Sequence, residues 1–403
     1  MQQLQQTSKT DEAALSVVGS GQSQDVIKGE SRAGRLVLRV FAGIGYVVVA
    51  GIAFAALIEL LSWAVWTVHP AMDPSKLQAS SPGYAGYDWA REFWKEEPVR
   101  QKLHAPYAPF RIWGLRPWHS EYINNDETPT GLVRRTINPT SPQCVSTHSI
   151  WVFGGSTTYG TGVPDFATWP SYLSRDLNAR GLCTTVTNFG VEGYLTNQEI
   201  VYLIEELKKR QPPETVIFYD GLNDSGAAGP TPGPPEPHFY IGTTASRIAG
   251  SPRARLDFIY ESYSARVLGP FLKPLVHRGP SLSGLPEAHE KATAVLDNYQ
   301  ANLRIVRALS SSYNFKLYCF WQPSLYYGHK SLVPFERALP VTDDWSRIVT
   351  AVYEEAKVRS ANGEFIFLGD VFDSVQEPLY IDQGHLAPRG NELAAQAVAR
   401  YIR

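Results

Sequence analysis

The chain has 403 residues, with 43% hydrophobic and 19% charged residues and a formal net charge of −2. That composition is typical of a globular protein with a buried core. Because no basic field covers the chain, nucleic acid is excluded as a partner, and three cysteines are too few for a disulfide-built scaffold. The nine histidines form no HxH or HExxH pair. We therefore expect neither a metal site nor a cofactor.

The first 68 residues predict a tail followed by a membrane anchor. Residues 1–35 are polar, and we expect a disordered cytoplasmic tail there. Residues 40–58 carry no charge over 19 positions, which is long enough to cross a bilayer as a helix, so 36–68 is assigned as a transmembrane signal anchor. Basic residues are concentrated before this run, at Lys28, Arg32, Arg35 and Arg39. The positive-inside rule then places the remainder of the chain outside the cytoplasm.

This apolar run has two other interpretations. A cleavable signal peptide has a short basic start and an apolar stretch of about 7–15 residues, whereas here roughly 39 residues precede a longer run. A buried helix of a soluble core is apolar on one stripe, whereas this run is apolar on every face. The sequence therefore favours an uncleaved anchor.

Residues 69–145 are rich in Pro, Tyr and Trp, show little periodicity, and predict a juxtamembrane collar. From about residue 146 to the end at 403, short apolar runs alternate with amphipathic stretches. The predicted strands are 149–153, 184–189, 215–219, 316–321 and 365–368, and the predicted helices are 172–178, 197–210, 287–311, 344–359 and one that starts near Pro388. This alternation predicts a parallel sheet covered on both faces, with its active site at the carboxyl ends of the strands.

A long insertion interrupts the alternation at about 226–284, after the third predicted strand. It contains the Pro- and Gly-rich run GPTPGPPEP at 229–237. Long loops are commonly either functional or irregular surface segments. The insertion is therefore either a lid or substrate platform near the site, or a surface loop.

Polar and small residues follow the predicted strands in an order that fits catalysis. Ser156 comes after two glycines that let the chain turn tightly and present its hydroxyl at the sheet edge. Gly190 could offer a backbone N–H to a substrate carbonyl, and Asn223 a side-chain amide. His385 can act as general base, oriented by Asp382 three residues earlier.

Each of these features is weak alone, since glycine turns, Asx turns and loop histidines are common. All of them occur in chain order at a strand end or in the final loop, and that agreement favours a catalytic site.

The four segments FGGSTTYG, NFGVEG, GLND and DQGH, starting at residues 153, 188, 221 and 382, resemble the SGNH or GDSL-like hydrolase superfamily. The resemblance covers about 146–403, with the insertion unmatched. It implies a flavodoxin-like three-layer α/β/α sandwich with a five-stranded parallel sheet. It also implies that Ser156 is the nucleophile, that Asp382 and His385 complete the triad, and that Ser156, Gly190 and Asn223 form the oxyanion hole.

One position departs from that superfamily. The residue before the nucleophile is usually Asp, and here it is Gly155. The triad does not need that Asp, so the chemistry stands and only the subclass is affected. The chain looks more like the membrane-tethered bacterial members, which implies an inner-membrane protein with a periplasmic catalytic domain.

The expected function is hydrolysis of small acyl esters, such as acetyl groups on an extracytoplasmic glycan, through an acyl-enzyme. Two alternatives stay open: an O-acyltransferase that passes the acyl group to a polysaccharide, and a catalytically silent domain that binds glycan or a partner. Cys144 and Cys183 each precede a predicted strand and are expected to pair in an exported domain. Two unpaired thiols are the alternative.

Overall fold

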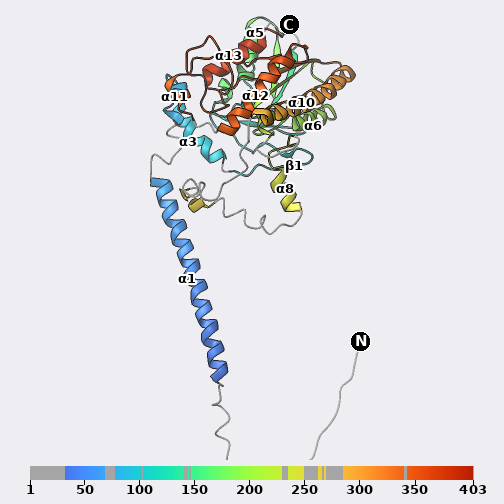
Figure 1. Ribbon diagram of the computed structural model, residues 1–403. Coiled ribbons are helices and arrows are strands. Elements are labelled where there is room, and N and C mark those ends of the chain that lie inside the picture. The colour runs from blue at the N-terminus through green and yellow to red at the C-terminus, as the bar shows by residue number, and fades with distance from the viewer. Residues whose placement is uncertain are drawn as a thin grey trace, which may run out of the picture. The chain divides into compact units, whose positions relative to one another are not determined.

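The computed structural model describes residues 32–68, 78–101, 103–139, 144, 147–228, 235–248, 262–265, 267–268, 285–339 and 343–402 (Figure 1). The chain divides into two units, one ending at Leu61 and the other beginning at Ser62.

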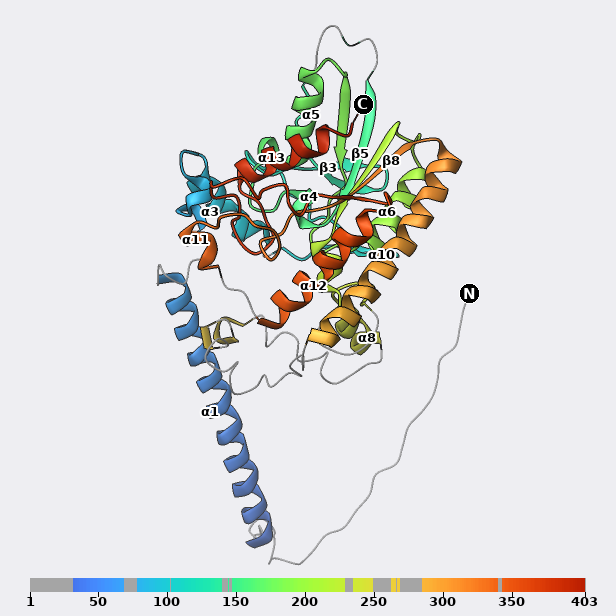
Figure 2. The same ribbon diagram turned by 45° about the horizontal axis from the view of Figure 1, so that its top comes forward.

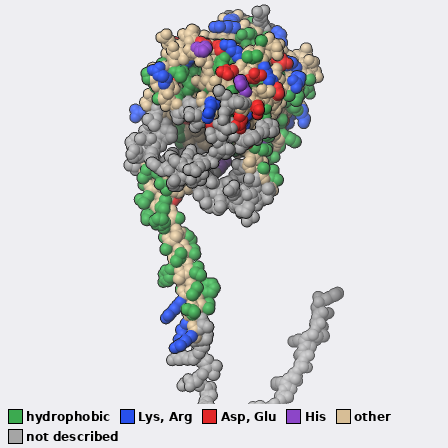
Figure 3. Space-filling view, in the orientation of Figure 1, with side chains coloured by type: hydrophobic (Ala, Val, Ile, Leu, Met, Phe, Trp, Pro, Cys, Tyr) green, Lys and Arg blue, Asp and Glu red, His purple; other side chains and the backbone are tan. Residues whose placement is uncertain are grey.

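The first unit is dominated by helix α1, Arg32–Val68, whose 37 residues span ~55 Å at the rise of an α-helix. Its stretch Gly34–Val65 is long and apolar enough to cross a membrane, and residues 34–57 are exposed along their whole length. Figure 3 shows hydrophobic side chains along this helix and basic ones at its N-terminal end. The helix is a candidate membrane span or signal sequence. It begins inside the segment 1–35 predicted as a tail, while residues 1–31 lie outside the described part of the chain.

The second unit is built on a seven-stranded sheet with the order β3-β4-β6-β5-β7-β8-β9. Five of these strands are parallel: β5 His148–Gly154, β6 Thr184–Asn188, β7 Thr215–Asp220, β8 Lys316–Trp321 and β9 Ile366–Phe367. They are the five strands predicted from the sequence, with ends that differ by at most one residue. The predicted α/β fold with five parallel strands is confirmed, and two antiparallel strands extend it.

Helices cover both faces of the sheet (Figure 2). One face carries α5 Trp169–Ala179 and α13 Pro388–Ala399, which pack against each other. The other carries α6 Thr196–Leu207, α10 Leu285–Tyr313 and α12 Asp343–Ser360. Side chains of β5 point alternately to the two faces of the sheet. Ile150 and Val152 pack on the α5 side, and Trp151 and Phe153 pack on the α6 side.

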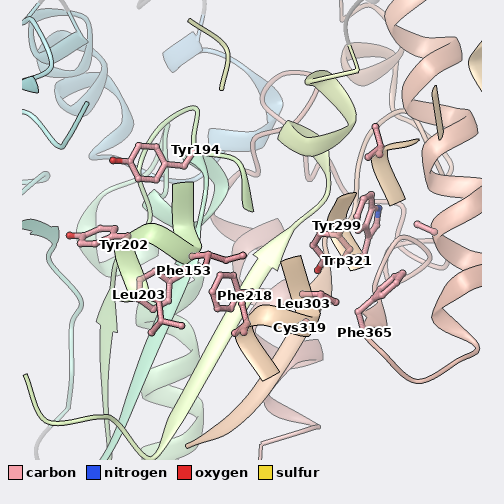
Figure 4. Packing of buried hydrophobic residues seen from close by; sticks show 14 of the residues in the cluster. Phe153, Tyr194, Tyr202, Leu203, Phe218, Tyr299, Leu303, Cys319, Trp321 and Phe365 are labelled. Carbon is pink, nitrogen blue, oxygen red and sulfur yellow. The ribbon is translucent and has the colours of Figure 1, made fainter. Parts of the chain in front are cut away.

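The larger core lies on the α6 and α10 side of the sheet (Figure 4). The Phe153 ring stacks on Phe218 with centroids 5.4 Å apart, and Tyr202 of α6 meets Phe153 edge-on at 5.8 Å. Tyr299 of α10 meets Trp321 at 5.0 Å in the same way. These aromatic layers hold the carboxyl ends of β5, β7 and β8 in fixed positions.

The predicted collar is not a separate, irregular segment. Its described part contains η2 Pro82–Tyr84, α3 Ala90–Gln101, the strand pair β1 Tyr107–Ala108 and β2 Ile112–Trp113, and the hairpin β3 Asn125–Thr128 with β4 Gly131–Arg134. Strand β4 joins the main sheet where Arg134 pairs antiparallel with Asn188 of β6. Part of the segment predicted as a collar therefore shares one sheet with the strands of the predicted hydrolase domain. Sequence periodicity missed these strands because they are only two to four residues long.

The insertion predicted at 226–284 is described only in part. After β7 comes the short helix α7, Leu222–Gly226, and residues 235–248 end in helix α8, Ile241–Ile248. Most of the remainder lies outside the described residues.

Candidate active site

The serine side chain is presented where β5 ends and the short helix α4, Ser156–Tyr159, begins. Two glycines make this turn possible. A Cβ on Gly154 would lie 2.1 Å from Thr158 Oγ1, and a Cβ on Gly155 would lie 2.2 Å from the Asn223 side-chain nitrogen. The close approach of Asn223 is a physical reason for Gly155 at the position where the superfamily usually carries Asp.

A hydrogen-bonded series runs from Ser156 to His385, 229 residues later in the sequence, and from His385 to Asp382. His385 Nε2 lies 2.7 Å from Ser156 Oγ, and His385 Nδ1 lies 2.7 Å from Asp382 Oδ2. Asp382 Oδ1 accepts the backbone N–H of Gly384 at 2.9 Å and that of His385 at 2.8 Å. Nδ1 then carries the proton toward the carboxylate, which leaves Nε2 free to accept the serine proton.

The electrostatics of the pair suit this arrangement. Burial acts to raise the pKa of Asp382, but the charge and hydrogen bond of His385 and the two backbone N–H bonds lower it far below its usual range. Burial acts to lower the pKa of His385, but Asp382 outweighs it and raises this pKa above the ordinary value for histidine. The carboxylate stays ionised and supports a positive charge on the imidazole.

Asn223 lies beside the serine, as the second residue of α7. Its Nδ2 donates to the Tyr194 carbonyl oxygen at 2.8 Å. That bond fixes the amide plane and uses one of the two amide hydrogens. The second hydrogen is available to a ligand close to Gly155 and Ser156.

Gly190 does not fit its predicted place in the oxyanion hole. Its N–H donates to Asn188 Oδ1 at 2.9 Å in a buried contact, and a Cβ there would lie 2.3 Å from the Tyr159 backbone nitrogen. Its role is to let the chain pass close to α4. The prediction is corrected because that N–H is already bonded inside the protein.

Gly193, three residues later in the segment NFGVEG, has the features that Gly190 lacks. It adopts a φ of +77° that favours glycine, and the turn is closed by a bond of 3.1 Å from Tyr194 N–H to the Val191 carbonyl. Among the described residues the Gly193 N–H has no hydrogen-bond partner. Its place as the second glycine of the segment made it a candidate, but nothing in the sequence ranked it above Gly190.

A buried acidic group beneath Asn223 was also missed. Burial raises the pKa of Glu199, Asp220 and Asp224, in the last case to about 6. Asp224 accepts hydrogen bonds from the Thr196 N–H and hydroxyl, which ties α7 to the start of α6. Asp224 thereby braces the helix that carries Asn223, and the spacing of the three acids in the sequence gave no sign of it.

The structure joins Cys144 to Cys183 by a disulfide, and Cys319 is buried as a free thiol. His148, the first residue of β5, donates its N–H to the Cys183 carbonyl. The bond therefore lies at the amino edge of the sheet, opposite the serine.

A serine, a histidine and an aspartate in hydrogen-bonded series at the carboxyl edge of a parallel α/β sheet are the arrangement used by hydrolases. The GDSL-like lipase/acylhydrolase family model matches residues 152–393, which is more than half of the chain. The chain belongs to the GDSL-like lipase/acylhydrolase family. Fold and family together identify it as an acyl-ester hydrolase.

Solved structures similar to the chain include three bacterial proteins. A member of the lipolytic G-D-S-L family from Veillonella parvula is 15% identical, covering 63% of this chain and 97% of that one with a TM-score of 0.34. A putative lipolytic protein of the same family from Desulfitobacterium hafniense is 12% identical, with coverages of 63% and 99% and a TM-score of 0.33. An acetylxylan esterase from Geobacillus stearothermophilus is 17% identical, with coverages of 63% and 94% and a TM-score of 0.32. No curated protein matches the chain.

Proposed function

We propose that the protein is a membrane-anchored serine esterase that acts outside the cytoplasm. The observation that carries the proposal is the series Ser156–His385–Asp382, with 2.7 Å at each step. Ser156 Oγ attacks the acyl carbonyl while His385 Nε2 takes its proton and then protonates the leaving alcohol. Water next attacks the acyl-enzyme with His385 again as base, which releases the acid and restores the serine.

The oxyanion of both tetrahedral intermediates needs donors beside Ser156. The Ser156 N–H at the start of α4, the free amide hydrogen of Asn223 and the N–H of Gly193 supply them in this proposal. The Tyr194 carbonyl connects the last two, because it belongs to the residue after Gly193 and accepts from Asn223 at 2.8 Å.

Aromatic side chains flank this turn and favour a sugar-bearing ester. A Cβ on Gly193 would lie 3.5 Å from the Trp113 ring and 3.9 Å from the Phe239 ring, and Tyr240 meets Trp113 edge-on at 4.9 Å. Phe239 is 37% exposed and Tyr240 is 56% exposed. Exposed rings beside a catalytic serine can stack on the apolar face of a pyranose, so we favour small acyl esters, such as acetate, on a glycan.

The membrane part of the proposal rests on helix α1. Arg32, Arg35 and Arg39 lie at its N-terminal end, so the positive-inside rule places the catalytic unit outside the cytoplasm. The Cys144–Cys183 disulfide fits an oxidising compartment and supports the same orientation.

The test uses the full-length protein in detergent with a fluorophosphonate probe and a series of acyl esters. We expect the probe to modify Ser156, as read by mass spectrometry, and acetyl esters to be cleaved faster than long-chain esters. A glycan acceptor added to the assay distinguishes hydrolysis from acyl transfer. Free acid as the product supports the esterase, whereas an acylated acceptor would identify the protein as a transferase. Unchanged ester cleavage by the Ser156→Ala protein would refute the mechanism.

A further inference from the structure

The turn that carries Gly193 is anchored by a residue whose role lies outside the triad. Glu192, the residue before Gly193, places its carboxylate between two arginine side chains. Arg100 of α3 binds it with two hydrogen bonds of 2.9 and 3.1 Å, and Arg116 adds one of 2.9 Å. Thr161 donates to the same carboxylate at 3.1 Å.

The anchor is rigid because Arg100 is itself fully engaged. It also binds Glu97 with bonds of 2.7 and 2.8 Å, and both side chains of that pair are 1% exposed. The Arg100 guanidinium lies 5.0 Å from the ring of Tyr159, the last residue of the helix that begins with Ser156. One arginine therefore contacts both the helix of the serine and the turn of Gly193.

Charge and backbone contacts show that Glu192 is held as an anion. Burial acts to raise its pKa, but Arg100 above all, with Arg116 and Thr161, lowers it to about 2. The indole N–H of Trp113 donates to the Glu192 carbonyl oxygen at 3.0 Å, so side chain and backbone of this residue are both fixed. The Glu192 carbonyl and the Gly193 N–H belong to the same peptide group. Because the carbonyl and the carboxylate of Glu192 are both held, this peptide group cannot rotate.

We propose that Arg100, Arg116 and Glu192 are positioning residues that hold the oxyanion turn, and that the juxtamembrane segment thereby completes the active site. The inference rests on the proposed esterase function and adds a requirement to it. Both arginines come from residues 78–118, outside the matched family segment 152–393. The segment between the anchor helix and the sheet thus contributes to catalysis without contacting substrate.

Glu192→Ala is the decisive variant, because Arg100 stays paired with Glu97 and no buried charge is left unpaired. We expect kcat per reactive serine to fall about 10- to 100-fold, since displacement of a catalytic donor by about 1 Å has an effect of that order. KM should change by less than about threefold, because the lost interaction belongs to the transition state. Glu192→Gln can still accept hydrogen bonds from the arginines and should recover part of kcat.

The matched control is Arg359→Ala. Arg359 also binds two carboxylates, Glu355 at 2.7 Å and Asp297 at 2.6 Å, but it lies at the end of α12 that precedes β9, at the amino edge of the sheet. The Arg359→Ala substitution should lower thermal stability, while kcat per reactive serine stays within about twofold of wild type because the two sites are distant from each other. A Glu192→Ala protein that behaves like this control would overturn the proposal.

Hydrogen exchange gives a readout that is independent of ester hydrolysis. In Glu192→Ala, amides over residues 190–194 should exchange faster than in wild type, while those of β7 keep their protection. Unchanged exchange over 190–194 overturns the positioning role even if the protein cleaves no ester. Absent activity in wild type together with the expected exchange change would refute only the proposed function.

Discussion

Gly155 offers a direct test of the oxyanion assignment through a single added methyl group. In Gly155→Ala the new Cβ would lie 2.2 Å from Asn223 Nδ2, 3.3 Å from its Cγ and 3.2 Å from the Tyr194 carbonyl oxygen. Non-bonded carbon and nitrogen settle near 3.5 Å, so the amide must move by roughly 1.3 Å. That movement breaks its bond to Tyr194 and removes the donor from the oxyanion position.

The expected loss is that of an oxyanion donor, about 10²–10³ in kcat. Steady-state hydrolysis of an acetyl ester, normalised to the serine that reacts with fluorophosphonate, measures it. Asn223→Ala should show a similar loss. The double variant should be no slower than either single variant, because both act on the same donor. It should also unfold at a higher temperature than Gly155→Ala, since alanine at 223 removes the clash.

Two outcomes would refute this reasoning. The first is a Gly155→Ala protein that keeps kcat within about threefold of wild type, because a displacement of this size should cost far more. The second is a double variant whose losses multiply, which would mean that Gly155 and Asn223 act independently.

Three further predictions concern the triad and the disulfide. Ser156→Ala and His385→Ala should lower kcat by similar large factors and Asp382→Asn somewhat less, because the three act as a unit; steady-state kinetics with active-site titration checks this. Asp382 raises the pKa of His385 above about 6.5, and the base must be neutral, so kcat/KM should fall as the pH drops through this pKa. Asp382→Asn should shift this acidic limb of the pH–rate profile to lower pH. The Cys144–Cys183 bond closes a loop with a sequence separation of 39, so its loss should cost about 4 kcal/mol of unfolding free energy, and alkylation of both thiols without reductant would contradict its formation.

The central parallel strands β5 and β7 were predictable because they are largely buried on both faces and read as nearly continuous apolar runs. Lys316–Trp321 was located to the residue, and its last three side chains are fully buried. The triad was predictable for a related reason: a parallel sheet brings the carboxyl ends of its strands to one edge, wherever they lie in the sequence. Ser156 and His385 therefore meet despite their 229-residue separation.

The choice between Gly190 and Gly193 was not predictable from the sequence. Both are glycines of the same short segment, NFGVEG. They differ because the Gly190 N–H is already hydrogen-bonded, whereas the Gly193 N–H has no partner among the described residues. The Asn188 side chain takes the Gly190 N–H, a fact of side-chain direction that no spacing reveals. Arg100 and Glu192 were missed for a similar reason, because 92 residues separate them and neither belongs to a periodic pattern.

The hairpin before the parallel strands has a role that follows from sheet physics. Without β4, the strand β6 would be an open edge beside the active site, and open edges invite pairing with other chains. Strand β4 covers β6 at Asn188, whose side chain also donates to the Thr158 carbonyl of α4 at 2.7 Å and accepts from Gly190. Arg134, the β4 partner of Asn188, pairs with Asp165 at 2.8 Å and lies 4.7 Å from the Tyr159 ring. The residues that close the sheet edge therefore also fix the helix of the serine, so the segment before the family match is as much a part of the catalytic unit as the sheet itself.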